Sequence, residues 1–392
     1  MQATALLQEL VRTPSIFGQE HAATAIVERE LRRLDVEVTS IPFDVDVLSR
    51  LGKAQQPFCT AHGRRNLIAR LRGKRGGRSL ILNCHLDVVP AGDPKEWDHH
   101  PFSGAVVDGR LYGRGAFDDK AGVAICLEVL NRLVASDLSG DLIAHFVLED
   151  ETTGNGSLLC LEGGPHADAA IIVDGTRGER GINQHAGNLK LRLSVFGKPA
   201  SVSVSHMGLN AAELLAEICL ALKAATLDLN KANAPPWSQF PSPNQLSTIA
   251  LHCDESALTV PTVAEATLYA TFTPPHTVAS FMTMARAIVD DIRRQAGAER
   301  APELQIEFAS EPVRSNAAEI EGAICRAGGR NIPFGPSTGT SDMRHFVDRN
   351  IPCVLFGPGQ GYNPHRVNEH FELKSLDEMA ALLTKVAVEW CG

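Results

Sequence analysis

Hydrophobic and polar positions divide the chain into regions with two kinds of strand. Short runs that are apolar on both faces lie at 66–71, 79–84, 141–148 and 169–173. Strands of this composition are typical of a sheet that helices cover on both faces. Between the second and third runs, "DDKAGVAICLEVLNRLVAS" predicts a largely buried helix. The alternation of strand and helix therefore predicts an α/β domain with a mostly parallel sheet.

The pattern changes near Gly187. Residues 188–196 alternate apolar and polar side chains, as a strand with one solvent-facing side does. A helix at about 209–225, two more alternating stretches, a helix at about 277–296 and a last strand complete a βαββαβ unit. Helices and buried strands then resume. The predicted boundaries are 1–183 and 311–392 for the first and second parts of a catalytic domain, and 184–310 for a domain inserted between them.

Composition narrows the class of protein. The chain has 392 residues, of which 44% are hydrophobic and 21% charged, as expected for a globular protein of two domains. The net charge is −9 and the one basic stretch, 70–78, is short, so nucleic acid is not an expected partner. No apolar run approaches the ~20 residues of a membrane span. Nine scattered cysteines without a C-x-x-C pair favour a reducing, cytoplasmic location.

Two polar residues end the buried run "ILNCHLDVVP". His85 and Asp87 are two positions apart, so in a strand their side chains leave the same face. The carboxyl ends of strands in an open α/β sheet are where functional sites form. Asp87 could accept the far N–H of His85 and fix its tautomer, as happens around metal-binding histidines. The alternative is a histidine at a strand end that is bonded to a loop carbonyl.

Further acids and a histidine follow other predicted strands. Asp118 and Asp119 open a helix in "GRGAFDDKAG", where N-capping alone explains one aspartate. The carboxylates of 149–151 come directly after one strand and Asp174 after the next, and His365 lies in a glycine-rich loop. Three adjacent carboxylates repel one another, so either a cation lies near them or they point into water. Two divalent metal ions that share one carboxylate would need this inventory, and no cysteine lies among these groups.

The ordered set of motifs resembles the dinuclear zinc aminoacylase and carboxypeptidase family. That family includes acetylornithine deacetylase, succinyl-diaminopimelate desuccinylase and glutamate carboxypeptidase. The matching motifs, which run in the family's order, are "HLDVVP", "GRGAFDDKAG", the acidic triplet, "IIVDG", "GTSDMRHF" and "GPGQGYNPHRVNE".

The resemblance implies a role for each matching residue. A metal-bridging water would attack the amide, a carboxylate before the second metal's ligand would act as general base, and the inserted domain would form a lid that in many members makes a homodimer. By this resemblance, His85 and Asp174 would bind one ion, Glu151 and His365 the other, Asp118 would bridge them, Asp87 would orient His85, and Arg344 would pair with a substrate carboxylate. A helix-surface salt bridge is the alternative for Arg344.

The chain departs from the family pattern at three positions. Ser201 stands where the family has a lid histidine, and Thr271 stands where an arginine is common. His206 is the nearest imidazole to Ser201, so either residue could replace the missing group, or His206 is a plain exposed side chain. Asp150 stands where a glutamate is expected as the general base.

The acidic triplet allows two registers. Either Asp150 is the base and Glu151 the ligand, or Glu149 is the base and Asp150 the ligand. The ligand should stand just before the short turn that ends in glycine, and "TGNG" follows Glu151. We therefore predict that Asp150 transfers the proton.

The expected function is metal-dependent hydrolysis of the amide bond in a small N-acyl amino acid. A dipeptidase or carboxypeptidase on the same scaffold is the first alternative, and a weakly active metal-binding relative is the second. Zinc is the expected metal, with cobalt or manganese as alternatives. The expected partners are the small substrate and a second copy of the chain, with no membrane.

Overall fold

The computed structural model describes residues 3–52, 54–57, 59, 63–254 and 258–392. Two compact units are present. The first consists of Met1–Asn183, Arg314–Gly335 and Ser341–Gly392, and the second of Gln184–Val313 and Pro336–Thr340. In the described ranges, no helix combines the length and apolar character that crossing a bilayer requires.

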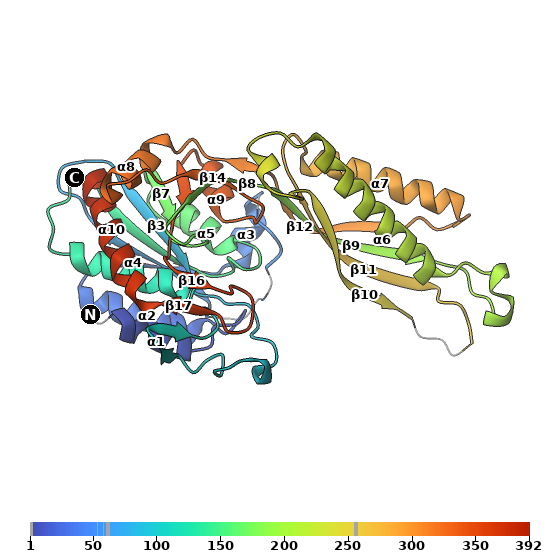
Figure 1. The fold of residues 1–392 in the computed structure, drawn as a ribbon, viewed down its shortest axis with the longest axis horizontal. Helices are drawn as coiled ribbons and strands as arrows, with labels where there is room; N and C mark the ends of the chain where they lie inside the picture. Colours follow the sequence, from blue (N-terminus) through green and yellow to red (C-terminus); the bar gives the residue numbers. More distant parts are fainter. Residues whose placement is uncertain (1–2, 53, 58, 60–62, 255–257) are drawn as a thin grey trace. The chain divides into compact units, whose positions relative to one another are not determined.

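A large mixed sheet forms the centre of the first unit (Figure 1). The neighbouring strands β6, β3, β7 and β15 run parallel. Antiparallel pairs flank this group: β1 with β2, β2 with β6, and β15 with β8. The sheet is therefore mixed, with a parallel group of strands at its centre. Its order is β1 (Glu37–Pro42), β2 (Arg65–Leu71), β6 (Leu142–Val147), β3 (Leu80–His85), β7 (Ala169–Ile172), β15 (Cys353–Leu355), β8 (Gly181–His185) and β13 (Val313–Arg314), with β14 (Phe334–Ser337) beside β8.

Helices cover both faces of this sheet because its strands are apolar on both faces. Leu80 and Leu82 of β3 belong to the core that α4 and its neighbouring helices share. Asn83 points to the other face, where the Ser157 hydroxyl of α5 donates to it. The first layer holds α1 (Ala3–Arg12), α2 (His21–Leu34), α4 (Lys120–Leu133), α8 (Ala318–Gly328) and α10 (Leu373–Cys391), and the second holds α3 (Val45–Arg50), α5 (Asn155–Gly163) and α9 (Met343–Val347).

A small antiparallel sheet also belongs to the first unit. Its order is β16 (Gly361–Tyr362), β17 (His370–Glu372), β5 (Arg110–Tyr112) and β4 (Ala105–Val107). The loop between β16 and β17 carries His365.

The second unit has its own sheet and core. Strands β10 (Gln245–Cys253), β11 (Val263–Phe272), β9 (Gly187–Phe196) and β12 (Glu303–Ser310) pair antiparallel in that order. Alternate residues of β9, such as Leu191 and Leu193, share a core with α6 (Ala211–Asp228) and α7 (Val278–Gln295). The element order is the expected βαββαβ, so the predicted fold class is confirmed. Pro336–Thr340 also packs with this unit, although its sequence lies in the predicted segment 311–392.

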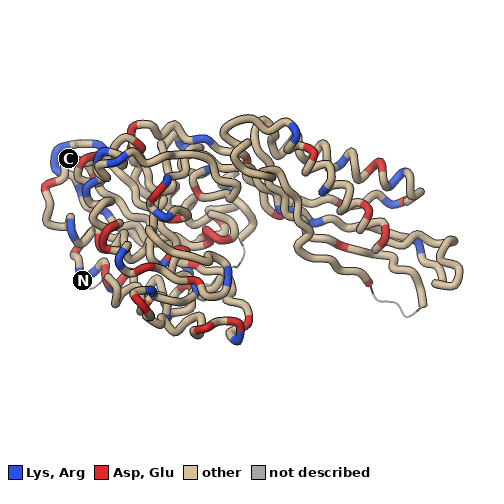
Figure 2. Tube along the Cα trace, viewed as in Figure 1, with Lys and Arg blue, Asp and Glu red and all other residues tan. Residues whose placement is uncertain are grey.

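Charged residues of both signs are interspersed along both units (Figure 2). Several form exposed pairs, such as Arg29 with Glu9 at 2.7 Å. Exposed pairs of this kind contribute only ~0–1 kcal/mol. The charges that bear on function are therefore the buried ones of the first unit.

Candidate metal centre

Three parallel strand ends bring the predicted ligands to one edge of the large sheet. His85 is the last residue of β3, Asp174 follows β7, and Asp150 and Glu151 follow β6. Because β6, β3 and β7 are parallel neighbours, their carboxyl ends lie side by side. The donor atoms of His85, Asp150 and Asp174 all lie within 4.8 Å of one another.

Asp118 lies between two imidazoles. Its Oδ1 is 3.0 Å from Nε2 of His85, and its Oδ2 is 3.2 Å from Nε2 of His365. The Oε2 atom of Glu151 lies 2.9 Å from the same Nε2 of His365. The turn before α4 supplies Asp118, and the β16–β17 loop supplies His365. The two oxygens of one carboxylate thus reach different histidines, as a ligand shared by two ions would.

The donor set fits divalent metal ions. Imidazole nitrogen and carboxylate oxygen are the ligands that Zn²⁺ takes at ~2.0–2.2 Å. A second group of donors within 4.8 Å of one another consists of His85, Asp118 and Glu151. No thiolate belongs to either group among the described residues.

Electrostatics favour cations at this edge of the sheet. Burial, together with the charge of Asp118, raises the pKa of Asp174 to about 7 and that of Glu151 to about 8. Hydrogen bonds to Asp118 and Glu151 raise the pKa of His365 to about 10. The cluster therefore retains protons near neutral pH, and a bound cation would displace them.

Asp87 contacts His85 in another way than expected. The Nδ1 atom of His85 lies 2.9 Å from the backbone oxygen of Asp87, whereas the Asp87 carboxylate is 3.7 Å from it. The carboxylate instead accepts from the backbone N–H groups of Asp150 at 3.3 Å and Glu151 at 3.2 Å. Asp87 thus orients the ring through its carbonyl and the acidic triplet through its side chain.

The three carboxylates of the acidic triplet point to different surroundings. Glu149 is fully buried and its Oε1 lies 2.6 Å from Nη1 of Arg64. Asp150 has an oxygen 3.9 Å from Nε2 of His85. Glu151 faces His365, as described above. The geometry thus supports the register in which Glu149 takes no part in the chemistry, while the roles of Asp150 and Glu151 stay predictions.

Arg344 is a buried side chain of α9. It is 8% exposed, and its guanidinium donates to the backbone oxygens of Ser341 and Thr153, both at 2.8 Å. Asp342, which is fully buried, lies 3.5 Å away. These contacts differ from the helix-surface salt bridge that was the alternative. They place Arg344 beside the turn that follows the acidic triplet, and its role toward substrate stays a prediction.

The residues at the other departures lie in the second unit. His206 and Ser201 are exposed, His206 in a short 3₁₀ helix, Val202–Met207, and Ser201 directly before it. Thr271 is buried in β11 and accepts from Asn188 at 2.9 Å. The metal-ligand groups of the first unit include none of these three residues.

Sequence reasoning missed Glu369, a buried residue four positions after His365. Its carboxylate accepts from the backbone N–H groups of Phe117 at 3.0 Å and Asp118 at 3.1 Å, and from Nη1 of Arg114 at 2.6 Å. Glu369 thereby fixes the turn that carries Asp118. The motif "HRVNE" contained this acid, but nothing in its spacing pointed to backbone N–H groups so far away in the sequence.

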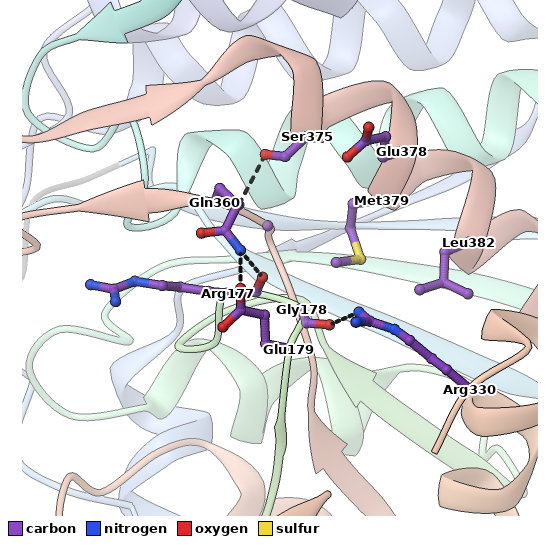
Figure 3. A pocket seen from close by; sticks show the side chains of 10 residues that line it. Arg177, Gly178, Glu179, Arg330, Gln360, Ser375, Glu378, Met379 and Leu382 are labelled. Carbon is purple, nitrogen blue, oxygen red and sulfur yellow. Dashed lines mark hydrogen bonds between the residues drawn. The ribbon is translucent and has the colours of Figure 1, made fainter. Parts of the chain in front are cut away.

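A pocket of about 210 Å³ in the first unit is lined by Glu179, Arg330 and Gln360, among other residues (Figure 3). Its polar groups pair largely with one another: Nε2 of Gln360 donates to Glu179, and Arg330 donates to the backbone oxygen of Gly178. None of the residues that line it is a predicted ligand. The pocket is therefore distinct from the group of predicted metal ligands, which is the candidate active site.

A comparison with protein families shows to which family this chain belongs. The model of peptidase family M20/M25/M40 matches residues 81–389, which include every predicted ligand. The chain belongs to this family. It is accordingly a metal-dependent hydrolase, and the resemblance seen in its motifs is confirmed.

Related proteins of this family act on different substrates. The chain is 30% identical to a succinyl-diaminopimelate desuccinylase of Gluconacetobacter diazotrophicus, over 98% of this chain and 97% of that protein. It is 26% identical to the N-formyl-4-amino-5-aminomethyl-2-methylpyrimidine deformylase of Bacillus subtilis, over 88% and 87%. A tripeptidase structure from Staphylococcus aureus shares the fold with a TM-score of 0.76 at 19% identity, covering 100% of this chain and 98% of that one.

Proposed function

We propose that this protein removes the acyl group from a small N-acyl amino acid by hydrolysing the amide bond. The observation that carries the proposal is the position of Asp118 between His85 and His365, with Asp150 beside His85. The similarity to a desuccinylase and to a deformylase supports amide hydrolysis of an acylated amine.

The residues of this chain would divide the work. His85, Asp118 and Asp174 would hold one divalent ion, and Asp118, Glu151 and His365 the other. Bound ions of this kind supply Lewis acidity and lower the pKa of a water molecule between them. Asp150 would take a proton from the attacking water and return it to the leaving amine. Arg344 would pair with the substrate carboxylate.

Zinc is the proposed metal because imidazole nitrogen and carboxylate oxygen, the donors that come together here, are ligands that Zn²⁺ commonly takes. Elemental analysis of the purified protein, followed by chelation and reloading with Zn²⁺, Co²⁺ or Mn²⁺, identifies the ion that supports turnover. A cytoplasmic location stays a prediction.

A substrate panel tests the proposal. Acetyl, succinyl and formyl derivatives of amino acids should be hydrolysed faster than dipeptides with the same carboxyl-terminal residue. Faster cleavage of the dipeptides would instead favour the peptidase. The peptidase alternative is consistent with the family and with the fold shared with the tripeptidase. Metal binding without turnover of any member would favour a weakly active relative.

We also propose that the second unit is a lid that forms a homodimer. Its strand β10 is an edge strand, and Ile249 and Leu251 of that strand are 56% and 58% exposed. Such an edge invites pairing with the same strand of another copy. Light scattering that gives the mass of one chain at micromolar concentration would contradict the dimer.

A further inference from the structure

The acidic triplet raises a geometrical problem. In a continuing strand, successive side chains point to opposite faces, so Glu149 and Glu151 would share one face and Asp150 would take the other. The chain instead sends Asp150 and Glu151 to the metal cluster and Glu149 away from it. The backbone changes direction at Glu149, whose φ of 64° lies in the left-handed region. Non-glycine residues adopt this region rarely, so other contacts must hold Glu149 there.

Two side chains hold the Glu149 carboxylate. Its Oε1 lies 2.6 Å from Nη1 of Arg64, and its Oε2 accepts from the hydroxyl of Thr153 at 2.5 Å. Both carboxylate oxygens are therefore bonded, as a fully buried carboxylate requires.

Arg64 itself is fixed from its other edge. Its Nε and Nη2 atoms donate to the two oxygens of Glu20 at 3.1 and 2.7 Å. The side chain of Arg64 is 2% exposed, and those of Glu20 and Glu149 are 0% exposed. A planar guanidinium has enough donors to serve both carboxylates at once, which an ammonium group cannot do with this geometry.

The backbone of the same turn is held from two sides. The carbonyl oxygen of Glu149 accepts from the N–H groups of Thr153 at 2.9 Å and Gly154 at 2.7 Å. The Asp87 carboxylate accepts from the N–H groups of Asp150 and Glu151. The direction of these two side chains is therefore set by groups that do not belong to the metal cluster.

We propose that Glu149, held by its salt bridge to Arg64, is a positioning residue that turns Asp150 and Glu151 toward the other candidate metal ligands. This proposal rests on the proposed function, in which Glu151 is a metal ligand and Asp150 the general base. Glu149 touches neither metal nor substrate in that scheme and acts only through the turn.

A matched pair of variants tests the proposal. Glu149→Gln removes the negative charge that pairs with Arg64 at the turn. Glu20→Gln removes the negative charge that pairs with the opposite edge of the same guanidinium. Glu20→Gln leaves the Arg64–Glu149 pair balanced. We expect Glu149→Gln to lower Zn²⁺ affinity and kcat by about 10-fold or more with KM little changed, as loss of a partner behind a ligand does. Glu20→Gln should change either quantity less than 2-fold, although both variants lower the melting temperature.

Amide hydrogen exchange gives a readout that needs neither metal nor substrate. The segment 148–156 should exchange faster in metal-free Glu149→Gln than in the wild type, and at the wild-type rate in Glu20→Gln. Equal effects of the two variants on exchange and on Zn²⁺ affinity would overturn the proposal. The ion pairs of Arg64 with Glu20 and Glu149 would then stabilise the fold in general and not this turn in particular. Unchanged exchange in Glu149→Gln would overturn it as well.

Arg64→Lys is the second variant, for use where Glu149→Gln does not fold. Lysine keeps the positive charge but lacks the planar set of donors that lets a guanidinium contact two carboxylates. We therefore expect faster exchange of 148–156 and weaker Zn²⁺ binding in a folded protein. Wild-type affinity and exchange in Arg64→Lys would contradict the proposal. Failure of the proposed function has a different signature: the wild type would bind metal and hydrolyse no substrate, while the exchange difference between the variants would persist.

Discussion

The Nε2 atom of His365 lies 3.2 Å from Oδ2 of Asp118, and these two residues come from distant parts of the sequence. Glu369 holds them together, because it follows His365 in the chain and its carboxylate accepts from the N–H of Asp118. The hairpin that carries His365 and the turn that carries Asp118 are thus joined through one buried carboxylate.

We expect two divalent ions per chain, and loss of at least one of them in Asp118→Asn. The amide keeps the shape of the side chain but offers one weak oxygen ligand in place of two charged ones. Metal analysis after dialysis against Zn²⁺ measures the stoichiometry. Asp290→Asn is the control, because this aspartate is 62% exposed and lies in the second unit. A wild type that holds a single ion at saturation would contradict the prediction.

We expect Asp150→Asn to lower kcat by about 10²–10⁴-fold, the usual range for a lost general base. Its metal content should stay at the wild-type level. Glu151→Gln should instead lower metal affinity, since it removes the charge of a proposed ligand next to His365. The combination of steady-state kinetics and metal titration separates these effects. If Asp150→Asn loses an ion and Glu149→Gln loses only turnover, the other register of the triplet is correct.

We expect metal binding at pH 7 to release protons. The pKa values of Asp174 and Glu151 are raised to about 7 and about 8, and that of His365 to about 10, so these groups still carry protons in the metal-free protein. Metal affinity should therefore rise as the pH increases from 6 to 8. Calorimetric titrations in buffers of different ionisation enthalpy count the protons released. A count of zero at pH 7 would show that the cluster is already ionised.

We expect His145→Leu to stabilise the protein. His145 of β6 is fully buried, and neither ring nitrogen has a hydrogen-bond partner among the described residues. An unpartnered buried polar group costs ~1–3 kcal/mol. Urea unfolding at pH 7 measures the change, and His166→Leu on the surface serves as the control.

The effect of His145 should grow in acid. Burial lowers the pKa of His145 from 6.5 to about 3. Below pH 6.5 His145 is therefore protonated in the unfolded chain but stays neutral in the folded chain until the pH approaches 3. Wild-type stability is therefore lost as the pH falls from 6.5 toward 3. At pH 5 the advantage of His145→Leu should be larger by about 2 kcal/mol. An advantage that is independent of pH would contradict this explanation.

Much of the site could be predicted because it lies at strand ends. Parallel order brings the ends of β6, β3 and β7 together, so His85, Asp174 and the acidic triplet could be grouped from strand periodicity alone. Periodicity could not show which member of the triplet faces the cluster, because the backbone leaves strand geometry at Glu149.

The supporting residues were not predictable from the sequence. Arg64 and Glu369 each bond to groups far away along the chain, and neither stands in a spacing that suggests its partner. Asp342 is similar: burial, and next the charge of Asp150, raises its pKa to about 7, which only three-dimensional proximity reveals. The sequence also did not show which strands of the large sheet pair antiparallel, because an apolar strand has the same pattern in either direction.

The two histidines of the cluster differ in their access to water. The side chain of His85 is 2% exposed, whereas that of His365 is 52% exposed. An ion held on the side of His365 would therefore exchange with bulk solution sooner than its neighbour. A brief treatment with chelator should thus leave a half-loaded population, and the two halves of the centre would be kinetically distinct although one carboxylate joins them.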